Sequence, residues 1–511
     1  MDQSEALAAY PPDVAASAES VAEAQRSRPD VLVVLDDDPT GTQSVADLPV
    51  LTQWDEADFD WAFREDAPAV YVLTNTRSLV EDDAAARNEE VVTNALAAAA
   101  RAGLTVRFAS RSDSTLRGHF PLETDVIAET LEAVTGQRID GVVIVPAFPE
   151  AGRVTVGGVH YMRSGDDLVP IADTEFARDA TFGYSSSALA EWVEEKTGGR
   201  TPRDKVLVLD LGTIRRSADA IADVITQATH SAPIVADAAT EDDLRLLSLG
   251  IIVAEGRGSR LLYRVGPPFV RARIGQEQRE PLRADEIFGD ESLPARDASA
   301  ADSATGGLIV VGSHVGLTSR QLERLRAERP SVPTVEIDVE AIVDDDRREA
   351  HLLTVVDRVT TALRTGDAIV NTSRVLVRSD DPDESLDISR RVSAAVVAVV
   401  QRTLGLVTPR FVIAKGGITS SDVAAFGLGI RHAIIRGPML PGMVSMWQAV
   451  DGPAAGIPYI VFAGNVGDDT SLASVVDTLS PRPTSDSPTS QSTSTSTPTT
   501  APATRESEHH A

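Results

Sequence analysis

The feature that most constrains the fold is a series of short apolar runs, rich in β-branched residues, that alternate with longer stretches of helical periodicity. Several runs are followed directly by Asp, Gly, Ser or Thr. This pattern is typical of buried parallel strands that are connected by helices and feed polar loops at their carboxyl ends. The runs are Val31–Leu35, Val70–Leu73, Val106–Ala109, Val142–Val145, Val206–Leu209, Leu308–Val311, Ala368–Val370, Phe411–Ala414, Ala433–Ile435 and Tyr459–Phe462. We therefore predict an α/β fold built from mainly parallel sheets with flanking helices.

An acidic stretch without apolar runs divides this series into two parts and predicts two domains. We place a first domain at residues 30–285, a linker at 286–306 and a second domain at 307–480, with the active site in the cleft between the domains. Residues 1–29 are rich in Ala and Ser, and we expect a flexible arm or a peripheral helix there. Residues 481–511 are almost wholly Ser, Thr and Pro at first, and we expect a disordered tail.

Charge and cysteine content exclude several classes of function. The chain of 511 residues has 77 acidic and 47 basic residues, a formal charge of −30, so we expect neither nucleic acid nor a membrane surface as a partner. It contains no Cys, which excludes disulfides, thiolate metal sites and a Cys nucleophile. We find no signal sequence or membrane span and expect a cytoplasmic protein. The sequence leaves the oligomeric state open, a homo-oligomer included.

Three strand ends of the first half carry polar motifs, and ligands of open α/β sheets bind beyond such ends. Arg side chains could hold a carboxylate, and hydroxyl or amide groups could hold a polyol. We therefore predict a site for a small, oxygen-rich anion. A segment at 145–149 could form its wall or be an ordinary turn. The candidates are Asp36, Asp37, Asp38 and Thr40, then Asn75 and Arg77, then Arg111, Ser112, Asp113 and Ser114.

The strand ends of the second half carry glycine-rich loops. Lys415 is one of only three lysines in the chain, and it stands beside a Gly pair that leads into a helical stretch. Backbone N–H groups and an ammonium group at such a place suit phosphate. No Walker A pattern occurs. The candidates for phosphate binding are Ser313, Lys415, Gly416, Gly417, Ile418, Thr419 and Gly464.

Taken in order, these motifs resemble those of the four-carbon acid sugar kinases over residues 30–478. The matching segments are 35–43, 73–78, 111–118, 146–148, 155–161, 179–184, 312–313, 415–420 and 464–467. The resemblance implies a sugar-acid-binding domain followed by a nucleotide-binding domain, with ATP held by Ser313, residues 416–419 and Gly464. It implies a substrate such as a threonate, an erythronate, a 3-oxo-tetronate or 3-oxo-isoapionate, used in carbohydrate catabolism. The long acidic motif at 36–38 differs from the shorter form of many members, which leaves the substrate open.

For phosphoryl transfer we expect Arg77 or Arg111 to bind the substrate carboxylate, and Asp37 or Asp113 to orient the attacking hydroxyl and accept its proton. Lys415 would stabilise phosphate charge, with Mg²⁺ bridging the phosphates.

Two other functions remain open from the residues. Asp36 and Asp38 also fit the Asp-x-Asp-x-Thr pattern of aspartyl-phosphate phosphatases, with Asp36 as nucleophile and Asp38 as acid/base. A metabolite-binding protein without catalysis would also have two α/β lobes. The phosphatase alternative leaves the Arg-Ser-Asp-Ser-Thr motif and the Lys-Gly-Gly segment unexplained, and a binding protein would not need two chemically distinct sets of loops.

Overall fold

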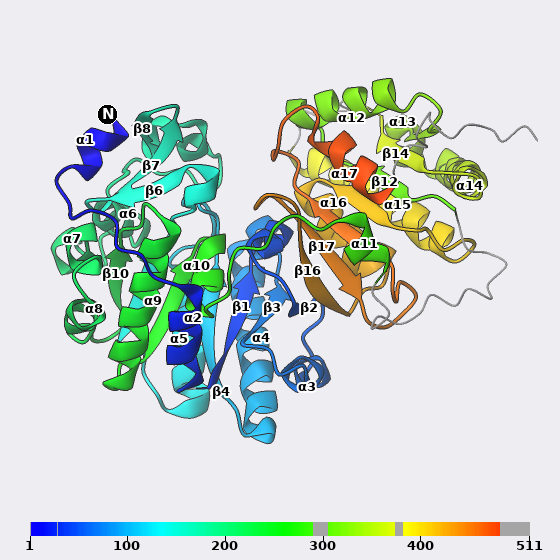
Figure 1. Ribbon diagram of the computed structural model, residues 1–511. Coiled ribbons are helices and arrows are strands. Elements are labelled where there is room, and N and C mark those ends of the chain that lie inside the picture. The colour runs from blue at the N-terminus through cyan, green and yellow to red at the C-terminus, as the bar shows by residue number, and fades with distance from the viewer. Residues whose placement is uncertain (1, 28, 290–304, 374–381, 481–511) are drawn as a thin grey trace, which may run out of the picture. The chain divides into compact units, whose positions relative to one another are not determined.

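The computed structural model describes residues 2–27, 29–289, 305–373 and 382–480, the side chains of 382–387 excepted (Figure 1). The predicted tail at 481–511 and most of the predicted linker at 286–306 lie outside the described residues. The chain up to Ser480 forms one compact unit. Within the described residues, no helix has the length and apolar composition that crossing a bilayer requires.

Fifteen strands form one sheet, in the order β13-β14-β12-β15-β18-β17-β16-β2-β3-β1-β4-β11-β5-β10-β9. All neighbours are parallel except at the three contacts β18–β17, β17–β16 and β16–β2. The first half contributes β1 (Asp30–Asp36), β2 (Leu48–Leu51), β3 (Ala69–Leu73), β4 (Thr105–Arg111), β5 (Gly141–Val145), β9 (Leu207–Leu209), β10 (Ala232–Ala236) and β11 (Leu261–Val265). The second half contributes β12 (Leu308–Val311), β13 (Thr334–Ile337), β14 (Ala368–Thr372), β15 (Val412–Lys415), β16 (His432–Leu440), β17 (Val444–Ala449) and β18 (Pro458–Phe462). The mainly parallel α/β fold is thus confirmed.

Both faces of the sheet are covered by helices, which explains why the strands read as continuous apolar runs. Successive side chains of a strand point to opposite faces, and in β1 Leu32 and Val34 join one hydrophobic cluster while Val33 and Leu35 join another. The longer helices are α2 (Ala18–Arg26), α3 (Glu56–Arg64), α4 (Glu81–Ala102), α5 (Leu122–Thr135), α6 (Leu189–Lys196), α8 (Ala218–Ile225), α9 (Glu241–Gly256), α12 (Gly316–Glu328), α14 (Asp345–Leu363), α15 (Pro382–Leu404) and α17 (Ser471–Leu479). The shorter ones are α1 (Gln3–Leu7), α7 (Leu211–Ile214), α10 (Pro267–Arg273), α11 (Ala284–Phe288), α13 (Val339–Val343) and α16 (Gly417–Asp422).

One prediction about a single element needs correction. The run Ala433–Ile435 belongs to β16, which is antiparallel to both β17 and β2 and not a parallel strand. The reason is a tight turn around Gly442 (φ 61°), which returns the chain directly into β17. At the N-terminus, where a flexible arm and a peripheral helix were both open, the structure has α1 and α2, and α2 buries Val21 completely.

A second, three-stranded antiparallel sheet contains β6 (Arg153–Val156), β7 (Val159–Ser164) and β8 (Asp167–Pro170). These strands are absent from the sequence prediction, as are β2, β10, β11, β13 and β17. In these strands a polar residue or a proline interrupts or bounds the apolar run, and in β6 apolar and polar residues alternate. The small sheet matters because it contributes side chains to the site described next.

Candidate active site

The register of strands β1 and β4 places Asp36, the first residue of the acidic motif, beside Arg111. In the parallel pairing of β1 and β4, Asp36 lies opposite Arg111 at the end of both strands. Both side chains are buried, and Arg111 Nε donates a hydrogen bond to Asp36 Oδ1. Burial raises the pKa of Asp36 to about 8, although the charge of Arg111 opposes that shift. Asp36 is therefore a buried partner of Arg111, and it is not among the residues that line the three cavities described below.

The next two acids differ in their availability to a ligand. Asp37 is 2% exposed and accepts two hydrogen bonds from Arg77, from Nε at 3.0 Å and from Nη2 at 2.6 Å. Asp38 is 22% exposed; its Oδ1 accepts from the N–H of Thr40 at 2.9 Å, and its Oδ2 lies 3.5 Å from Arg77 Nη1. Burial acts to raise the pKa of Asp38, but the charges of Arg77 and Arg111 and the hydrogen bonds from Thr40 hold it below its ordinary value. Asp38 is thus ionised, and its side chain is the most accessible of the three.

The loop after β4 is fixed by its own side chains and by the small sheet. Asp113 accepts from Arg117 Nε at 2.6 Å and from the N–H of Thr115 at 3.2 Å. Burial acts to raise the pKa of Asp113, but the charges of Arg77 and Arg117 outweigh it and the pKa is lowered. His160 Nε2 on β7 donates to the carbonyl of Ser114 at 2.8 Å. The loop after β4 is therefore held in place by contacts within the protein before any ligand binds.

A polar cavity of about 330 Å³, here called the central cavity, lies beyond these strand ends. Residues of both halves of the chain line it, and its lining is rich in arginine. The first half contributes Asp38, Thr40, Gln43, Arg77, Arg111, Asp113, Ser114, Thr115, Arg117, Phe148, Arg153, Phe176 and Pro267, and the second half Ser313, Val315, Gly417, Ala463, Gly464, Asn465 and Val466. Its chemistry suits a small anion that carries hydroxyl groups.

A second cavity of about 430 Å³, the glycine-loop cavity, adjoins the first through four shared residues: Asp38, Arg77, Ser313 and Gly417. Its lining also includes Asp37, Asn75, Ser78, Gly312, Gly416, Ile418 and Thr419. Gly416 has φ 134°, and a Cβ there would lie 3.0 Å from Thr419 Oγ1 and 3.2 Å from Ser313 Cβ. The backbone thus approaches so closely that only glycine fits without displacement.

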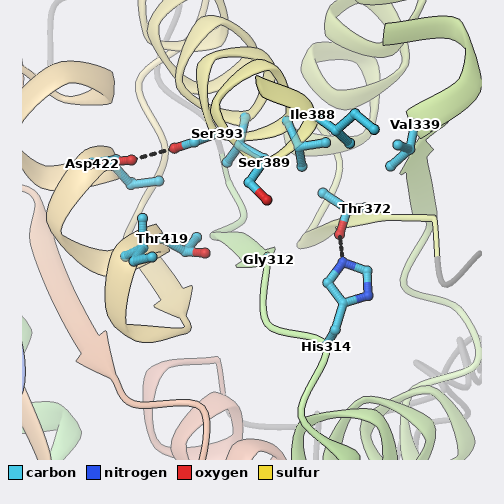
Figure 2. Close-up of a pocket in the computed structure, with 13 residues that line it drawn as sticks. Gly312, His314, Val339, Thr372, Ile388, Ser389, Ser393, Thr419 and Asp422 are labelled. Atoms are coloured by element: carbon cyan, nitrogen blue, oxygen red, sulfur yellow. Dashed lines mark hydrogen bonds between the residues drawn. The ribbon is translucent and has the colours of Figure 1, made fainter. Parts of the chain in front are cut away.

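A third cavity of about 230 Å³, the apolar cavity, shares Gly312, Ile418 and Thr419 with the glycine-loop cavity (Figure 2). Its lining includes Val339, Ile388, Val392, Val396 and Val423. Polar groups occur at its edge: Thr372 Oγ1 lies 3.1 Å from His314 Nε2, and the hydroxyl of Ser393 donates to Asp422. A mainly apolar slot with a few polar groups suits a flat heterocycle.

Lys415 does not lie where the sequence predicts. Its side chain is fully buried, and it is not among the residues that line the three cavities. Its Nζ donates to the carbonyl of Ala463 at 2.6 Å and lies 3.8 Å from the ring centre of Phe462. Burial lowers its pKa to about 7. In this structure the ammonium group anchors the loop that leads to Gly464, and it does not point at a phosphate site.

The other predicted residues divide into those that line a cavity and those that support it. Ser112 is buried, and its hydroxyl lies 3.2 Å from that of Ser110. It supports the loop after β4 and is not among the residues that line the central cavity. Phe148, in the segment for which a wall or a turn was open, lines the central cavity. The lining residues of that cavity that the sequence prediction missed include Gln43, Arg117, Arg153 and Phe176. Gln43 and Arg117 stand inside the quoted motifs and could have been found there, whereas Arg153 and Phe176 have no such signal.

Comparisons with known proteins match two domain models to the chain. A sugar-binding N-terminal domain model matches residues 32–273, and a nucleotide-binding C-terminal domain model matches residues 308–472. The D-erythronate kinase of Heliobacterium modesticaldum is 24% identical over 438 residues, 80% of this chain and 87% of the relative. The chain belongs to the four-carbon acid sugar kinase family. A second member, the D-threonate kinase of Cupriavidus necator, is 26% identical over 405 residues, 76% of this chain and 85% of the relative.

Solved structures show that a known fold extends over most of the chain. A Salmonella typhimurium protein matches with a TM-score of 0.61 and 20% identity over 87% of this chain and 98% of its own. A Haemophilus influenzae protein matches with a TM-score of 0.56 and 18% identity, over 88% of this chain and all of its own. At these identities the two structures support the fold alone.

Proposed function

We propose that this family member transfers the γ-phosphate of ATP to a hydroxyl group of a four-carbon or related sugar acid. The observation that carries the proposal is the row of three cavities, which share lining residues and change from apolar to glycine-rich to arginine-rich. In that order they suit a nucleotide base, its phosphates and a hydroxylated acid. The relatives named as D-erythronate and D-threonate kinases support the same substrate class.

The γ-phosphate would lie near the four residues that the central and glycine-loop cavities share. There Arg77 brings positive charge, Gly417 and Ser313 offer polar groups, and the Asp38 carboxylate would hydrogen-bond the attacking hydroxyl. Phosphoryl transfer passes through a loose transition state, so the nucleophile needs orientation more than strong base catalysis. An Asp with a lowered pKa can supply that orientation because it is always ionised at neutral pH. Asp38 therefore replaces Asp37 as our first candidate, with Asp113 second.

A magnesium ion fits the donor set at this place. Within the described residues no cluster of three or more metal-binding side chains occurs. Mg²⁺ in kinases is bound by one or two carboxylates together with substrate phosphates, and Asp38 Oδ2 offers such a carboxylate beside the glycine loop. When bound with the nucleotide, the ion would neutralise phosphate charge. The protein's part is to hold Asp38 between Thr40 and Arg77 so that its second oxygen faces the cavity.

The proposal is tested by ADP release from ATP in the presence of Mg²⁺ and a panel of four-carbon sugar acids. We expect release that depends on the acid, and Asp38→Asn should lower kcat about 100-fold or more because the hydroxyl loses its orienting acceptor. Asp204→Asn serves as the control, since Asp204 is 71% exposed and lies outside the cavities. A wild-type protein that releases no ADP with any acid of the family would contradict the proposal.

The phosphatase alternative has less support from the geometry. Its nucleophile would be Asp36, whose side chain is 1% exposed and hydrogen-bonded to Arg111. A nucleophilic carboxylate must reach the phosphorus atom, and Asp36 lines neither polar cavity. Hydrolysis of phosphorylated sugar acids without ATP, abolished by Asp36→Asn, would favour that alternative.

A further inference from the structure

Four arginines line the central cavity, and three of them already have carboxylate partners within the protein. Arg77 forms a two-point hydrogen bond with Asp37, and Arg111 pairs with Asp36. Arg117 Nε donates to Asp113 at 2.6 Å, and its Nη1 lies 3.5 Å from Asp179. Most of the donors that Arg77 and Arg111 could offer a substrate carboxylate are therefore engaged before a substrate binds.

Arg153, the fourth, has a different environment. Among the described residues its side chain has no carboxylate partner, and its buried Nε has no hydrogen-bond partner. Its guanidinium lies 5.8 Å from the ring centre of Phe176, and that of Arg117 lies 5.3 Å from the same ring. Burial lowers the pKa of Arg153, which means that its positive charge is poorly solvated there. The charge of Asp113 opposes that shift only in part, and an anion in the cavity would add the countercharge that the Arg153 guanidinium lacks.

The fold fixes Arg153 firmly at its place. It is the first residue of β6, where its N–H donates to the carbonyl of Phe148 at 3.0 Å and its carbonyl accepts from the N–H of Phe148 at 2.7 Å. Arg153 and Phe176 line the central cavity but not the glycine-loop cavity, whereas Asp38 and Ser313 line both. Arg153 thus lies apart from the place where the two cavities meet.

We propose that Arg153 binds the substrate carboxylate and sets the preference of this site for acids over neutral polyols. This assignment rests on the proposed function and replaces Arg77 and Arg111 in that role. The planar fork of a guanidinium matches the two oxygens of a carboxylate, and the ring of Phe176 packs beside the guanidinium of Arg153. With the carboxylate at Arg153, a hydroxyl of the same molecule can extend toward Asp38 and the nucleotide.

The test compares the full-length wild type with Arg153→Gln, Arg153→Lys and Arg163→Gln. Arg163 is the matched control because it lies on the neighbouring strand β7, is likewise half-buried with an unpaired Nε, and does not line the central cavity. Two readouts are used: calorimetric binding of D-erythronate, D-threonate and neutral erythritol, and ADP release with the KM values of acid and ATP. Thermal melting checks that each variant is folded.

We expect Arg153→Gln to weaken acid binding and lower kcat/KM for the acid about 10- to 100-fold, with erythritol binding and the KM for ATP unchanged. Arg153→Lys should recover part of the loss, because it keeps the charge without the fork, and Arg163→Gln should behave as the wild type. Unchanged acid affinity in a folded Arg153→Gln, or an equal loss in Arg163→Gln, would overturn the assignment.

The same data separate the assignment from the kinase activity. Acid binding that depends on Arg153, without ADP release, would keep the carboxylate site and remove the proposed activity. Acid-dependent ADP release in which Arg153→Gln changes only the KM for ATP would keep the activity and overturn the assignment. A wild type that binds none of the acids would overturn both.

Discussion

At the scale of single residues, the acidic loop after β1 shows how burial gives neighbouring carboxylates different roles. Asp36 and Asp37 are almost fully buried against Arg111 and Arg77, whereas Asp38 keeps a side chain that is 22% exposed. A buried carboxylate with an arginine partner holds that arginine in place, and an exposed one can contact a ligand. The three residues are adjacent copies of the same amino acid, and their roles differ because their surroundings in the folded protein differ.

Lys415 provides a prediction about protonation. Burial lowers its pKa to about 7, and the chain has only two other lysines, Lys196 and Lys205. In protein labelled with ¹³Cε-lysine, we expect one resonance to titrate near pH 7 and to disappear in Lys415→Met. A spectrum in which every lysine signal titrates above pH 9 would contradict the buried position of Lys415.

The same group predicts how stability depends on pH. Its folded pKa is lower than the 10.5 of the unfolded chain, so between about pH 7 and 10.5 the folded state binds fewer protons than the unfolded state. The unfolding free energy of the wild type should therefore rise with pH across this window, by up to about 1.4 kcal/mol per pH unit, relative to Lys415→Met. Urea unfolding of both proteins at pH 7 and pH 9 measures the difference. Parallel pH profiles would show that Lys415 is not desolvated.

At the scale of elements, the short 3₁₀ helix η1 (Pro39–Ser44) packs directly on the ion pair between β1 and β4. A Cβ on Gly41 would lie within 2.3 Å of both Arg111 Nε and Asp36 Oδ1. We expect Gly41→Ala to displace this pair, to destabilise the protein by about 1–3 kcal/mol and to lower kcat/KM about 100-fold. Thermal melting and ADP release test both effects.

Gly366→Ala is the control for this substitution, because a Cβ at Gly366 has no atom within 4 Å. It should leave both the melting temperature and the activity near those of the wild type. If Gly41→Ala behaved like Gly366→Ala, η1 would not be seated on the Asp36–Arg111 pair as the structure shows.

At the scale of the whole molecule, the two halves of the sheet are joined by the antiparallel pairing of β2 with β16. Side chains reinforce this joint: Asp58 of α3 accepts from Arg431 Nη2 at 2.9 Å and lies 2.7 Å from His432 Nε2. Trp447 Nε1 also donates to Thr42 Oγ1 at 2.9 Å. Residues far apart in the chain thus hold the acidic loop of the first half against the second half.

We expect this joint to couple the unfolding of the two halves. Asp58→Ala removes a buried acceptor from Arg431 and His432 and also one from the N-cap of α3, at a cost of about 2–4 kcal/mol. Scanning calorimetry should show a lower melting temperature and a split of the wild-type transition. Asp60→Ala, on the same helix but paired with the exposed Arg101, should change neither. Identical calorimetric traces for the two variants would contradict the coupling.

The sequence by itself determined the parallel core and the placement of polar motifs at its strand ends. A strand that is buried on both faces must be apolar along its length, so β1, β3, β4, β5, β12 and β15 are visible as runs. The residues after these runs must then lie at one edge of the sheet. The family follows from the same motifs, because their order along the chain is specific.

Only the tertiary structure decided which of these residues face a ligand. Whether an Asp is paired with an Arg depends on strand register, and whether Lys415 reaches a cavity depends on the packing of Ala463 and Phe462 around it. Arg153 enters the central cavity because the small sheet of β6–β8 folds next to a loop that is far from it in sequence. Burial, charge pairing and long-range contacts are properties of the folded chain, and local sequence patterns do not encode them.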